Sequence, residues 1–266
     1  MTDEIYKIKE IAKKAGDAIM EVYNSSDGSS DMGVTYKDDP TSSPLTKADL
    51  AANKIIKEGL ESIDSTPLLS EEIEAADYSV RKEWSRFWLV DPLDGTKEFI
   101  KKGNDFTVNI ALIENGEPVM GVVYAPVLDV FYLGEKGRGA VKINGEGEVE
   151  IKAGNYKEDG LKIVASKSHR SPELEEFISK LGESECVSMG SSLKLCLIAE
   201  GAANLYPRLG PTMEWDTGAA HAVVSAAGGR VTDFEGNDLV YNKEDLHNPH
   251  FIVTGSPAFD WKSKVN

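Results

Sequence analysis

The chain contains little cysteine and no long hydrophobic run. Its 266 residues include two cysteines, Cys186 and Cys196, whose spacing matches no metal-binding pattern. Cys196 lies in the apolar run 193–199, which is typical of a reduced cysteine in a protein core. No apolar stretch reaches the roughly 18 residues that suggest a membrane span. The sequence therefore predicts neither a cysteine-bound metal nor a transmembrane segment.

Basic residues are scarce, and the N-terminus carries no recognisable targeting signal. There are 29 Lys and Arg against 45 Asp and Glu, which gives a formal net charge of −16. Such a surface repels nucleic-acid backbones and argues against a nucleic-acid polymer as partner. A small anionic substrate stays compatible, because a bound cation can invert the local charge. Residues 1–4 lack the basic and apolar regions of a signal peptide, so we expect a cytoplasmic protein; a peripheral location at the inner membrane stays open.

The hydrophobic pattern predicts helices first and then an antiparallel meander in the first half of the chain. A composition of 41% hydrophobic and 28% charged residues is ordinary for a globular protein. Apolar residues at spacings of three and four indicate helices, and period-two alternation indicates strands. The expected elements are a helix over 4–23, a loop over 25–44, a helix over 48–63, an extended segment over 66–70, a strand ending at Val90, and strands within 105–143.

The second half alternates strands with helices. A glycine-rich segment between residues 134 and 160 predicts turns, and it marks the expected boundary between a domain over 1–150 and a domain over 151–266. The first is then α+β and the second α/β, in a chain that is α/β in class. Strands are expected near 161–165, 204–209 and 251–254, and helices near 172–181, 191–201 and 215–227.

The most informative stretch is Asp91-Pro92-Leu93-Asp94-Gly95-Thr96, directly after the apolar run 87–90. It places two carboxylates at the end of a buried strand, and buried carboxylates are costly unless something positive neutralises them. A hard divalent cation such as Mg²⁺ is the simplest neutraliser, since it favours oxygen ligands and often binds through carboxylates and substrate phosphate. The stretch therefore predicts part of a metal site.

Three further acidic residues have both an ordinary and a functional interpretation. Glu71 closes an extended apolar segment, but it also belongs to a small acidic run that a solvated loop would explain. Asp49 follows Thr46 at the start of a helix, and Asp216 begins another; helix capping would explain both. The helix after Asp216 consists mostly of small residues, which lets a neighbouring backbone approach closely. The residues alone leave both interpretations open.

Several other patterns point away from function. The run Gly134–Gly139 does not fit the dinucleotide-binding fingerprint and is expected to be a turn between two strands. His221 lies on a different helix face from Asp216, which favours a core or interface histidine. No serine has the context of a nucleophile elbow, and no His-Glu-x-x-His pattern is present. These observations disfavour serine-hydrolase and zinc-protease chemistry.

The acidic motifs together resemble those of a known family. Residues 71–72, 91–96 and 215–220 resemble the motifs of the lithium-sensitive, Mg²⁺-dependent phosphatase superfamily of inositol monophosphatases, fructose bisphosphatases and 3′(2′),5′-bisphosphate nucleotidases. Within it, residues 93–100, 190–194 and 205–208 look most like the bacterial-type bisphosphate nucleotidases. The resemblance implies a layered α/β/α/β/α sandwich of the sugar-phosphatase type, inhibition by Li⁺, and a homodimer as one oligomeric state.

The resemblance also implies roles for individual residues. The metal ligands for two or three Mg²⁺ would be Glu71, Asp91, Asp94, Asp216 and the main-chain carbonyl of Leu93. The residues that activate water would be Asp49 and Thr96, assisted by Glu71. The substrate-binding residues would be Gly95 and Thr96 through their main-chain amides, together with His169, Ser191, Lys194 and Arg208.

The expected reaction is Mg²⁺-dependent hydrolysis of adenosine 3′,5′-bisphosphate to AMP and phosphate. Lys194 and Arg208 suit a second phosphate, Lys as a point charge and Arg through its bidentate geometry. The first alternative is an inositol monophosphatase or fructose-1,6-bisphosphatase with the same mechanism. A lesser alternative is a non-catalytic sensor of a metal and a small phosphorylated ligand. The presence of Asp49, Glu71 and Thr96 disfavours the sensor, since it would need no group that activates water.

Overall fold

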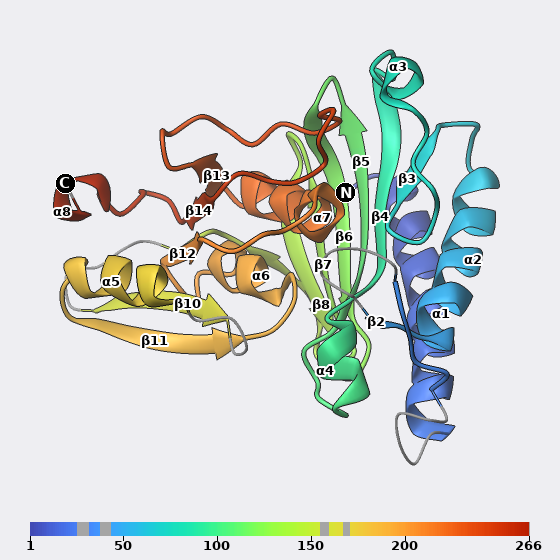
Figure 1. Cartoon of the computed structure of the whole chain (residues 1–266), viewed down its shortest axis with the longest axis horizontal. Coiled ribbons are helices and arrows are strands. Elements are labelled where there is room, and N and C mark those ends of the chain that lie inside the picture. The colour runs from blue at the N-terminus through green and yellow to red at the C-terminus, as the bar shows by residue number, and fades with distance from the viewer. Residues whose placement is uncertain (26–31, 38–43, 155–159, 167–170, 266) are drawn as a thin grey trace.

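The computed structural model describes residues 1–25, 32–37, 44–154, 160–166 and 171–265. Its helices and sheets form five layers (Figure 1). The first layer is α1 (Asp3–Ser25) with α2 (Lys47–Glu61), followed by a seven-stranded sheet. A central layer holds α6 (Leu193–Ala199) and α7 (Glu214–Ala226), and beyond it lie a five-stranded sheet and the outer helices α5 (Pro172–Lys180) and α8 (Lys262–Val265). This confirms the expected α/β/α/β/α sandwich.

The seven-stranded sheet contains the predicted meander. Its order is β3-β4-β5-β6-β7-β8-β9, with β3 parallel to β4 and all other neighbours antiparallel. The turn expected at 134–139 indeed joins β7 to β8, whereas β9 lies in the glycine-rich segment that was expected to separate two domains. The strands are β3 (Leu68–Ser70), β4 (Arg86–Asp94), β5 (Thr107–Glu114), β6 (Glu117–Ala125), β7 (Val130–Glu135), β8 (Gly139–Asn144) and β9 (Gly147–Ile151).

The five-stranded sheet has the order β11-β10-β12-β14-β13. Strands β11, β10 and β12 are parallel, and β14 and β13 are antiparallel to their neighbours. The sequence did not predict β11, a largely exposed edge strand without apolar alternation, or β13, which has four residues. The strands are β10 (Leu161–Ser166), β11 (Ser184–Met189), β12 (Leu205–Arg208), β13 (Arg230–Asp233) and β14 (Phe251–Thr254).

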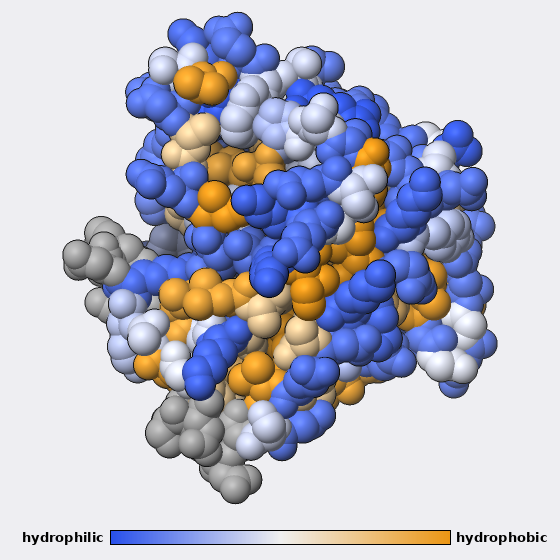
Figure 2. All heavy atoms as spheres, turned by 90° about the vertical axis from the view of Figure 1, so that its right-hand side faces the viewer, coloured by the Kyte–Doolittle hydropathy of each residue, from blue (hydrophilic) through white to orange (hydrophobic). Residues whose placement is uncertain are grey.

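The outer layer of α1 and α2 covers one face of the seven-stranded sheet. Both helices are amphipathic, as predicted, and α1 buries Ile5, Ile8 and Ile19 completely or almost so. The opposite face of the layer is mainly hydrophilic, with bands of hydrophobic atoms between the polar ridges (Figure 2). None of the helices in the described ranges is long and apolar enough to cross a bilayer.

The central helix α7 packs unusually close to the seven-stranded sheet. A Cβ added to Gly121 of β6 would lie 2.1 Å from the carbonyl oxygen of Ala219, and one added to Gly134 of β7 would lie 2.4 Å from Cα of Val223. This confirms the close approach expected from the small residues of this helix. One continuous apolar cluster contains residues from both sheets and from α7. The division at residue 150 stays a prediction.

The two cysteines behave as the sequence suggests. Cys196 is buried in α6, and burial raises the pKa of its thiol well above the ordinary value. A thiol that stays protonated is a poor nucleophile and metal ligand. Cys186 lies exposed on β11 and is likewise free. The expectation of a reduced core cysteine at 196 is confirmed.

Short elements complete the chain near the predicted motifs. They are β1 (Thr35–Tyr36), β2 (Pro44–Leu45), α3 (Tyr78–Arg81) and α4 (Thr96–Ile100). β1 pairs with β2 in front of α2, inside the segment that was expected to be a loop. α4 follows β4 directly and begins within the Asp-Pro-Leu-Asp-Gly-Thr stretch. β2 and α4 therefore lie directly beside acidic residues described next, whereas α3 lies between Glu71 and β4 in the chain.

Candidate active site

Three carboxylates from distant parts of the chain meet where β3, β4 and α7 come together. Ser70 of β3 pairs with Val90 of β4, so the following residues Glu71 and Asp91 lie side by side. The main-chain N–H of Glu71 donates to the carbonyl of Val90 at 3.1 Å. Asp216 arrives from the first turn of α7. Carboxylate oxygens of Glu71, Asp91 and Asp216 lie within 4.8 Å of one another.

The β4 strand does not end at Val90, as the sequence suggested, but continues through the motif to Asp94. Its register against β5 shifts between Asp91, opposite Asn109, and Asp94, opposite Thr107. Three steps on β4 thus match two on β5, which is a β-bulge. Without the bulge, residues three apart would point to opposite faces of the sheet. The bulge changes this alternation and lets the motif place both carboxylates at one site.

Asp94 lies next to the three-carboxylate cluster rather than inside it. Its Oδ2 accepts a hydrogen bond of 2.6 Å from the main-chain N–H of Ser192. Burial raises the pKa of Asp94, and the cations Lys194 and Arg208 partly offset this, while Glu71 raises the pKa further. Asp94 therefore stands between the acidic cluster and a pair of basic residues.

The electrostatics of the cluster call for a cation. Burial raises the pKa of Asp91 well above its ordinary value, and the neighbouring carboxylates of Glu71, Asp94 and Asp216 raise it further. Burial, followed by Asp94 and Glu71, raises the pKa of Asp216 to about 8. Oxygen donors held this close repel one another unless an ion lies between them, and Mg²⁺ favours such oxygen ligands. The donor set therefore fits the expected metal.

Asp216 combines helix capping with its place in the cluster. Its Oδ2 accepts a hydrogen bond of 2.9 Å from the main-chain N–H of Met213, at the start of α7. A carboxylate has a second oxygen, so the cap leaves the residue able to bind an ion. Gly218 of the same helix packs against β4, because an added Cβ would lie 2.7 Å from Cδ2 of Leu89. This packing brings Asp216 to Asp91.

Asp49 likewise caps a helix and is placed for the predicted role in activating water. It forms the capping box of α2 with Thr46, whose main-chain N–H donates to Oδ2 of Asp49 at 2.8 Å. The Thr96 hydroxyl lies 3.3 Å from Oδ1 of Asp49 and 3.1 Å from the carbonyl oxygen of Leu93. Burial raises the pKa of Asp49 to about 6, although the hydrogen bonds from Thr46 lower it. The cap and the contact with Thr96 use different oxygens.

Gly95 supplies the sharp change of direction between β4 and α4. Its φ of 90° lies in the left-handed region, which glycine adopts without strain. A Cβ at this position would also lie 2.9 Å from the carbonyl oxygen of Asp105. Both constraints explain why glycine stands here. Phosphate binding by the main-chain amides of Gly95 and Thr96 stays a prediction.

Three of the predicted substrate residues, Ser191, Lys194 and Arg208, lie near Asp94. Lys194 is buried, and its Nζ donates to the carbonyl of Ser191 at 2.5 Å and lies 5.7 Å from the ring centroid of Tyr206. Burial lowers the pKa of Lys194 to about 8, although Asp94 raises it. Arg208 at the end of β12 donates to the carbonyl of Pro211 at 2.9 Å. His169 lies outside the described residues.

One residue of the site escaped the sequence analysis. Nζ of Lys37 lies 2.8 Å from Oε1 of Glu71 and 2.7 Å from Oε1 of Glu72. Although burial lowers it, these two carboxylates raise the pKa of Lys37 above its ordinary value. The only available signal was a lysine in a segment expected to be a loop, which is too common to be informative. Lys37 therefore joins the site only through the fold.

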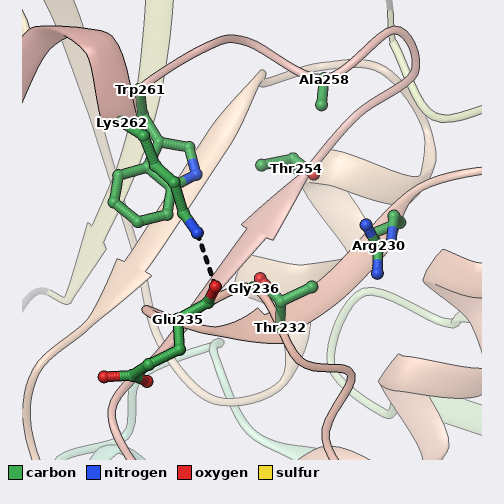
Figure 3. Close-up of a pocket in the computed structure, with 8 residues that line it drawn as sticks. All are labelled: Arg230, Thr232, Glu235, Gly236, Thr254, Ala258, Trp261 and Lys262. Atoms are coloured by element: carbon green, nitrogen blue, oxygen red, sulfur yellow. Dashed lines mark hydrogen bonds between the residues drawn. The ribbon is translucent and has the colours of Figure 1, made fainter.

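A hollow elsewhere in the molecule lacks such chemistry. It measures about 310 Å³ and lies beside β13 and β14, near the start of α8 (Figure 3). Its cations already have partners, because Lys262 donates to the carbonyl of Glu235 at 2.7 Å and Arg230 pairs with Asp238 at 2.7 Å. The convergent carboxylates at β4 and α7 are the stronger candidate for an active site.

Comparisons with known proteins agree with this geometry. Residues 1–259 match the model of the inositol monophosphatase family. The 3′(2′),5′-bisphosphate nucleotidases CysQ of Escherichia coli K12 and Salmonella typhimurium LT2 are 47% and 49% identical, each over 93% of this chain and 98% of the relative. The crystal structure of CysQ from Bacteroides thetaiotaomicron is 42% identical with a TM-score of 0.83, covering 95% of this chain and 97% of that chain.

Proposed function

The chain belongs to the inositol monophosphatase family, and we propose that it is a Mg²⁺-dependent phosphomonoesterase that hydrolyses adenosine 3′,5′-bisphosphate to AMP and phosphate. One observation carries the proposal: the carboxylates of Glu71, Asp91 and Asp216 converge within 4.8 Å. The relatives that are nearly half identical are nucleotidases for this class of substrate by name. This favours the nucleotidase over the inositol and fructose phosphatases.

The metal would be held by the predicted ligands. These are Glu71, Asp91, Asp94, Asp216 and the carbonyl of Leu93. Bound Mg²⁺ supplies charge for the phosphate, lowers the pKa of a coordinated water and stabilises the leaving oxygen. The ligands carry four negative charges, so two Mg²⁺ would leave a neutral pocket and three a positive one for the phosphate dianion.

Asp49 and Thr96 would together orient and deprotonate the attacking water. The Thr96 hydroxyl is within reach of Oδ1 of Asp49 at 3.3 Å. If the hydroxyl donates to this carboxylate, the oxygen of Thr96 can accept a hydrogen bond from the attacking water and orient it. The pKa of Asp49, raised by burial to about 6, suits a group that takes up a proton near neutral pH.

The second phosphate of the substrate would be bound on the far side of Asp94. Lys194 and Arg208 both lower the pKa of Asp94, so both lie near this carboxylate. A cation pair displaced from the proposed metal ligands can hold one phosphate while the other reacts. Ser191, whose carbonyl anchors Lys194, and His169 complete the proposed substrate contacts.

Phosphate release from three substrates in parallel tests the proposal. Adenosine 3′,5′-bisphosphate should be the preferred substrate over inositol 1-phosphate and fructose 1,6-bisphosphate at millimolar Mg²⁺. Preference for inositol 1-phosphate would overturn the nucleotidase and leave the family intact. Calorimetric binding of the nucleotide without turnover would favour the sensor. Millimolar Li⁺ should inhibit phosphate release. Full activity in Li⁺ would contradict the expectation that the chain shares the mechanism of the lithium-sensitive phosphatases.

Three further expectations from the sequence stay predictions. They are the cytoplasmic location with the option of the inner-membrane surface, the homodimer, and the domain boundary near residue 150. The proposed partner is a small phosphorylated molecule. Sedimentation analysis of the purified chain would decide between a monomer and a dimer.

A further inference from the structure

The connection between β13 and β14 passes over α7 to the seven-stranded sheet (Figure 1). We call its residues 241–248 the strap. At the sheet, the main-chain N–H of Tyr241 donates to the carbonyl of Gly116 at 3.0 Å. Farther along, the strap touches both the first turn of α7 and the end of α3. It is therefore placed to link the segments that carry Asp216 and Glu71.

On the α7 side, the strap is held by Glu214, which is fully buried. Its Oε2 accepts from the main-chain N–H of Asn242 at 2.6 Å, and its Oε1 accepts from that of Lys243 at 2.9 Å. Nζ of Lys243 donates to the same Oε1 at 2.5 Å. Both oxygens are thus committed to the strap. Asp216 is the second residue after Glu214 on the same helical turn.

On the α3 side, the strap is held by Arg81, whose exposed fraction is 3%. Its guanidinium donates to Oδ1 of Asn242 at 3.0 Å, to the carbonyl of Lys243 at 2.5 Å and to the carbonyl of Glu244 at 2.7 Å. Nδ2 of Asn242 donates a hydrogen bond of 2.6 Å to the carbonyl of Arg81. α3 lies at the end of the segment that begins with Glu71.

The end of the strap fixes the residues just before Asp216. The main-chain N–H of Asn248 donates to the carbonyl of Thr212 at 2.8 Å, and its Nδ2 donates to the carbonyl of Met213 at 2.8 Å. The N–H of Met213 in turn donates to Oδ2 of Asp216 at 2.9 Å. The strap therefore holds the backbone of Thr212 and Met213, and Met213 in turn orients the Asp216 carboxylate.

Stability alone explains this arrangement poorly. Burying the charge of Glu214 has a desolvation penalty that an ion pair often fails to offset, and its partner Lys243 is a quarter exposed. Glu214 also adds a negative charge close to a site that already repels its own carboxylates. Its geometric effect is specific, however, because one side chain fixes two successive main-chain N–H groups.

We propose that Glu214 and Arg81 are positioning residues, which act through the strap to hold the carboxylate of Asp216 at the separation from that of Glu71 that a metal ion needs. The inference rests on the proposed function, in which these two carboxylates are metal ligands. Side chains that orient metal ligands typically change metal affinity about 10- to 100-fold when they are replaced. The same range is expected here.

The test compares Glu214→Gln and Arg81→Lys with the unaltered protein by calorimetric titration with Mg²⁺ alone. Gln keeps the shape of Glu214, but its N–H₂ group would face one of the N–H donors that the carboxylate now accepts from. Lys has no planar guanidinium and cannot make the three hydrogen bonds of Arg81 to residues 242–244. Both variants should bind Mg²⁺ about 10- to 100-fold more weakly. In phosphate release, the Mg²⁺ concentration for half-maximal rate should rise, while the nucleotide KM and the rate at saturating Mg²⁺ stay near normal. Glu214→Asp, which keeps the charge, should recover part of the affinity.

Arg230→Lys is the matched control for Arg81→Lys, since the ion pair of Arg230 with Asp238 is exposed and includes no residue of the strap. It should leave Mg²⁺ binding unchanged. Variants that melt at a lower temperature but bind Mg²⁺ as tightly as the unaltered protein would overturn the positioning role and leave the proposed function standing. An unaltered protein that binds no Mg²⁺ would overturn both. If Arg81→Lys does not fold, the shape-preserving Glu214→Gln decides alone.

Discussion

The main-chain N–H of Ser192 donates a hydrogen bond of 2.6 Å to Oδ2 of Asp94, across 98 residues of sequence. The Ser192 side chain lies in the same network, with Oγ 2.8 Å from Oγ1 of Thr107 and donating to Oδ1 of Asn109 at 2.8 Å. Oγ1 of Thr107 also donates to Oγ of Ser191 at 3.2 Å, and the carbonyl of Ser191 accepts from Nζ of Lys194, two residues after Ser192. The proposed metal ligand Asp94 and the proposed substrate residues Ser191 and Lys194 therefore share one hydrogen-bonded network.

Replacing Asp94 by Asn should reduce kcat/KM by at least about 100-fold, because the change removes a charge that the metal requires. The amide oxygen of Asn can still accept from Ser192, so the fold should persist. Phosphate release and circular dichroism check the two parts. Glu58→Gln, on the exposed face of α2, is the control and should behave as the unaltered protein. Near-normal activity of Asp94→Asn would refute this residue as a ligand.

The hydroxyl of Thr96 should be needed for the rate rather than for binding. Thr96→Val removes the group that reaches Asp49 and keeps the shape, and should lower kcat by about 10²- to 10³-fold. Thr96→Ser keeps the hydroxyl and should retain most of the rate. Steady-state kinetics at saturating Mg²⁺ distinguish the pair. Equal losses in Val and Ser would show that the methyl group, not the hydroxyl, matters.

Mg²⁺ should stabilise the folded chain. At a concentration of 100 times its Kd, an ion that binds only the native state adds about 2.7 kcal/mol to the free energy of unfolding. For a chain of this size, that corresponds to a rise in Tm of about 5 to 10 °C. Melting curves with Mg²⁺ and with EDTA measure the effect, and Asp216→Asn should diminish it. Identical curves in both conditions would argue against a metal site.

His221 should make stability depend on pH. It is buried with Nδ1 2.8 Å from the Tyr241 hydroxyl, and burial lowers the pKa of His221 from 6.5 to about 4. Between these values the unfolded chain binds a proton that the folded chain does not, so this contribution to stability is complete above pH 6.5 and declines as the pH falls towards 4.

The size of this effect is on the order of 3 kcal/mol, since one pKa unit corresponds to about 1.36 kcal/mol. Urea unfolding in EDTA between pH 4.5 and 7 measures it for the unaltered protein and for His221→Gln. The carboxylates of the site titrate in both proteins and cancel in the comparison. The variant should lose less stability on acidification; parallel curves would mean that His221 is not the responsible group.

Close packing of α7 predicts a strong effect at Gly121. Gly121→Ala would place a methyl group 2.1 Å from the carbonyl oxygen of Ala219, and overpacking of this kind costs about 1–3 kcal/mol. Because α7 carries Asp216, the affinity for Mg²⁺ should fall as well. Gly145→Ala is the matched control, since its Cβ would meet nothing within 4 Å. Chemical unfolding of both variants measures the difference.

Local patterns in the sequence were sufficient for a large part of the fold. The spacing of Ile5, Ile8 and Ile19 predicted α1, and period-two alternation predicted the meander of β5 to β8. These patterns report which side of an element is buried, which is a local property. The strands β9, β11 and β13 were missed because they are short or largely exposed and bury no regular apolar face.

The acidic motifs of the site were also visible in the sequence, but their meeting was not. Asp49 and Asp216 both had helix capping as a sufficient explanation, and the structure shows that each does cap its helix. Lys37 carried no informative signal. A residue's neighbours in space depend on the packing of distant elements, so a single sequence yields them only by resemblance.

The sequence by itself determined the chemistry of the chain: paired carboxylates after a buried strand, a glycine turn and a hydroxyl at Thr96. Only the tertiary structure decided the geometry. Parallel pairing of β3 with β4 sets Glu71 beside Asp91, and the bulge in β4 re-aims Asp94 towards Ser192. The close approach of α7 to the sheet adds Asp216. The physical reason is that residue type fixes what an oxygen can bind, whereas packing fixes which oxygens can bind it together.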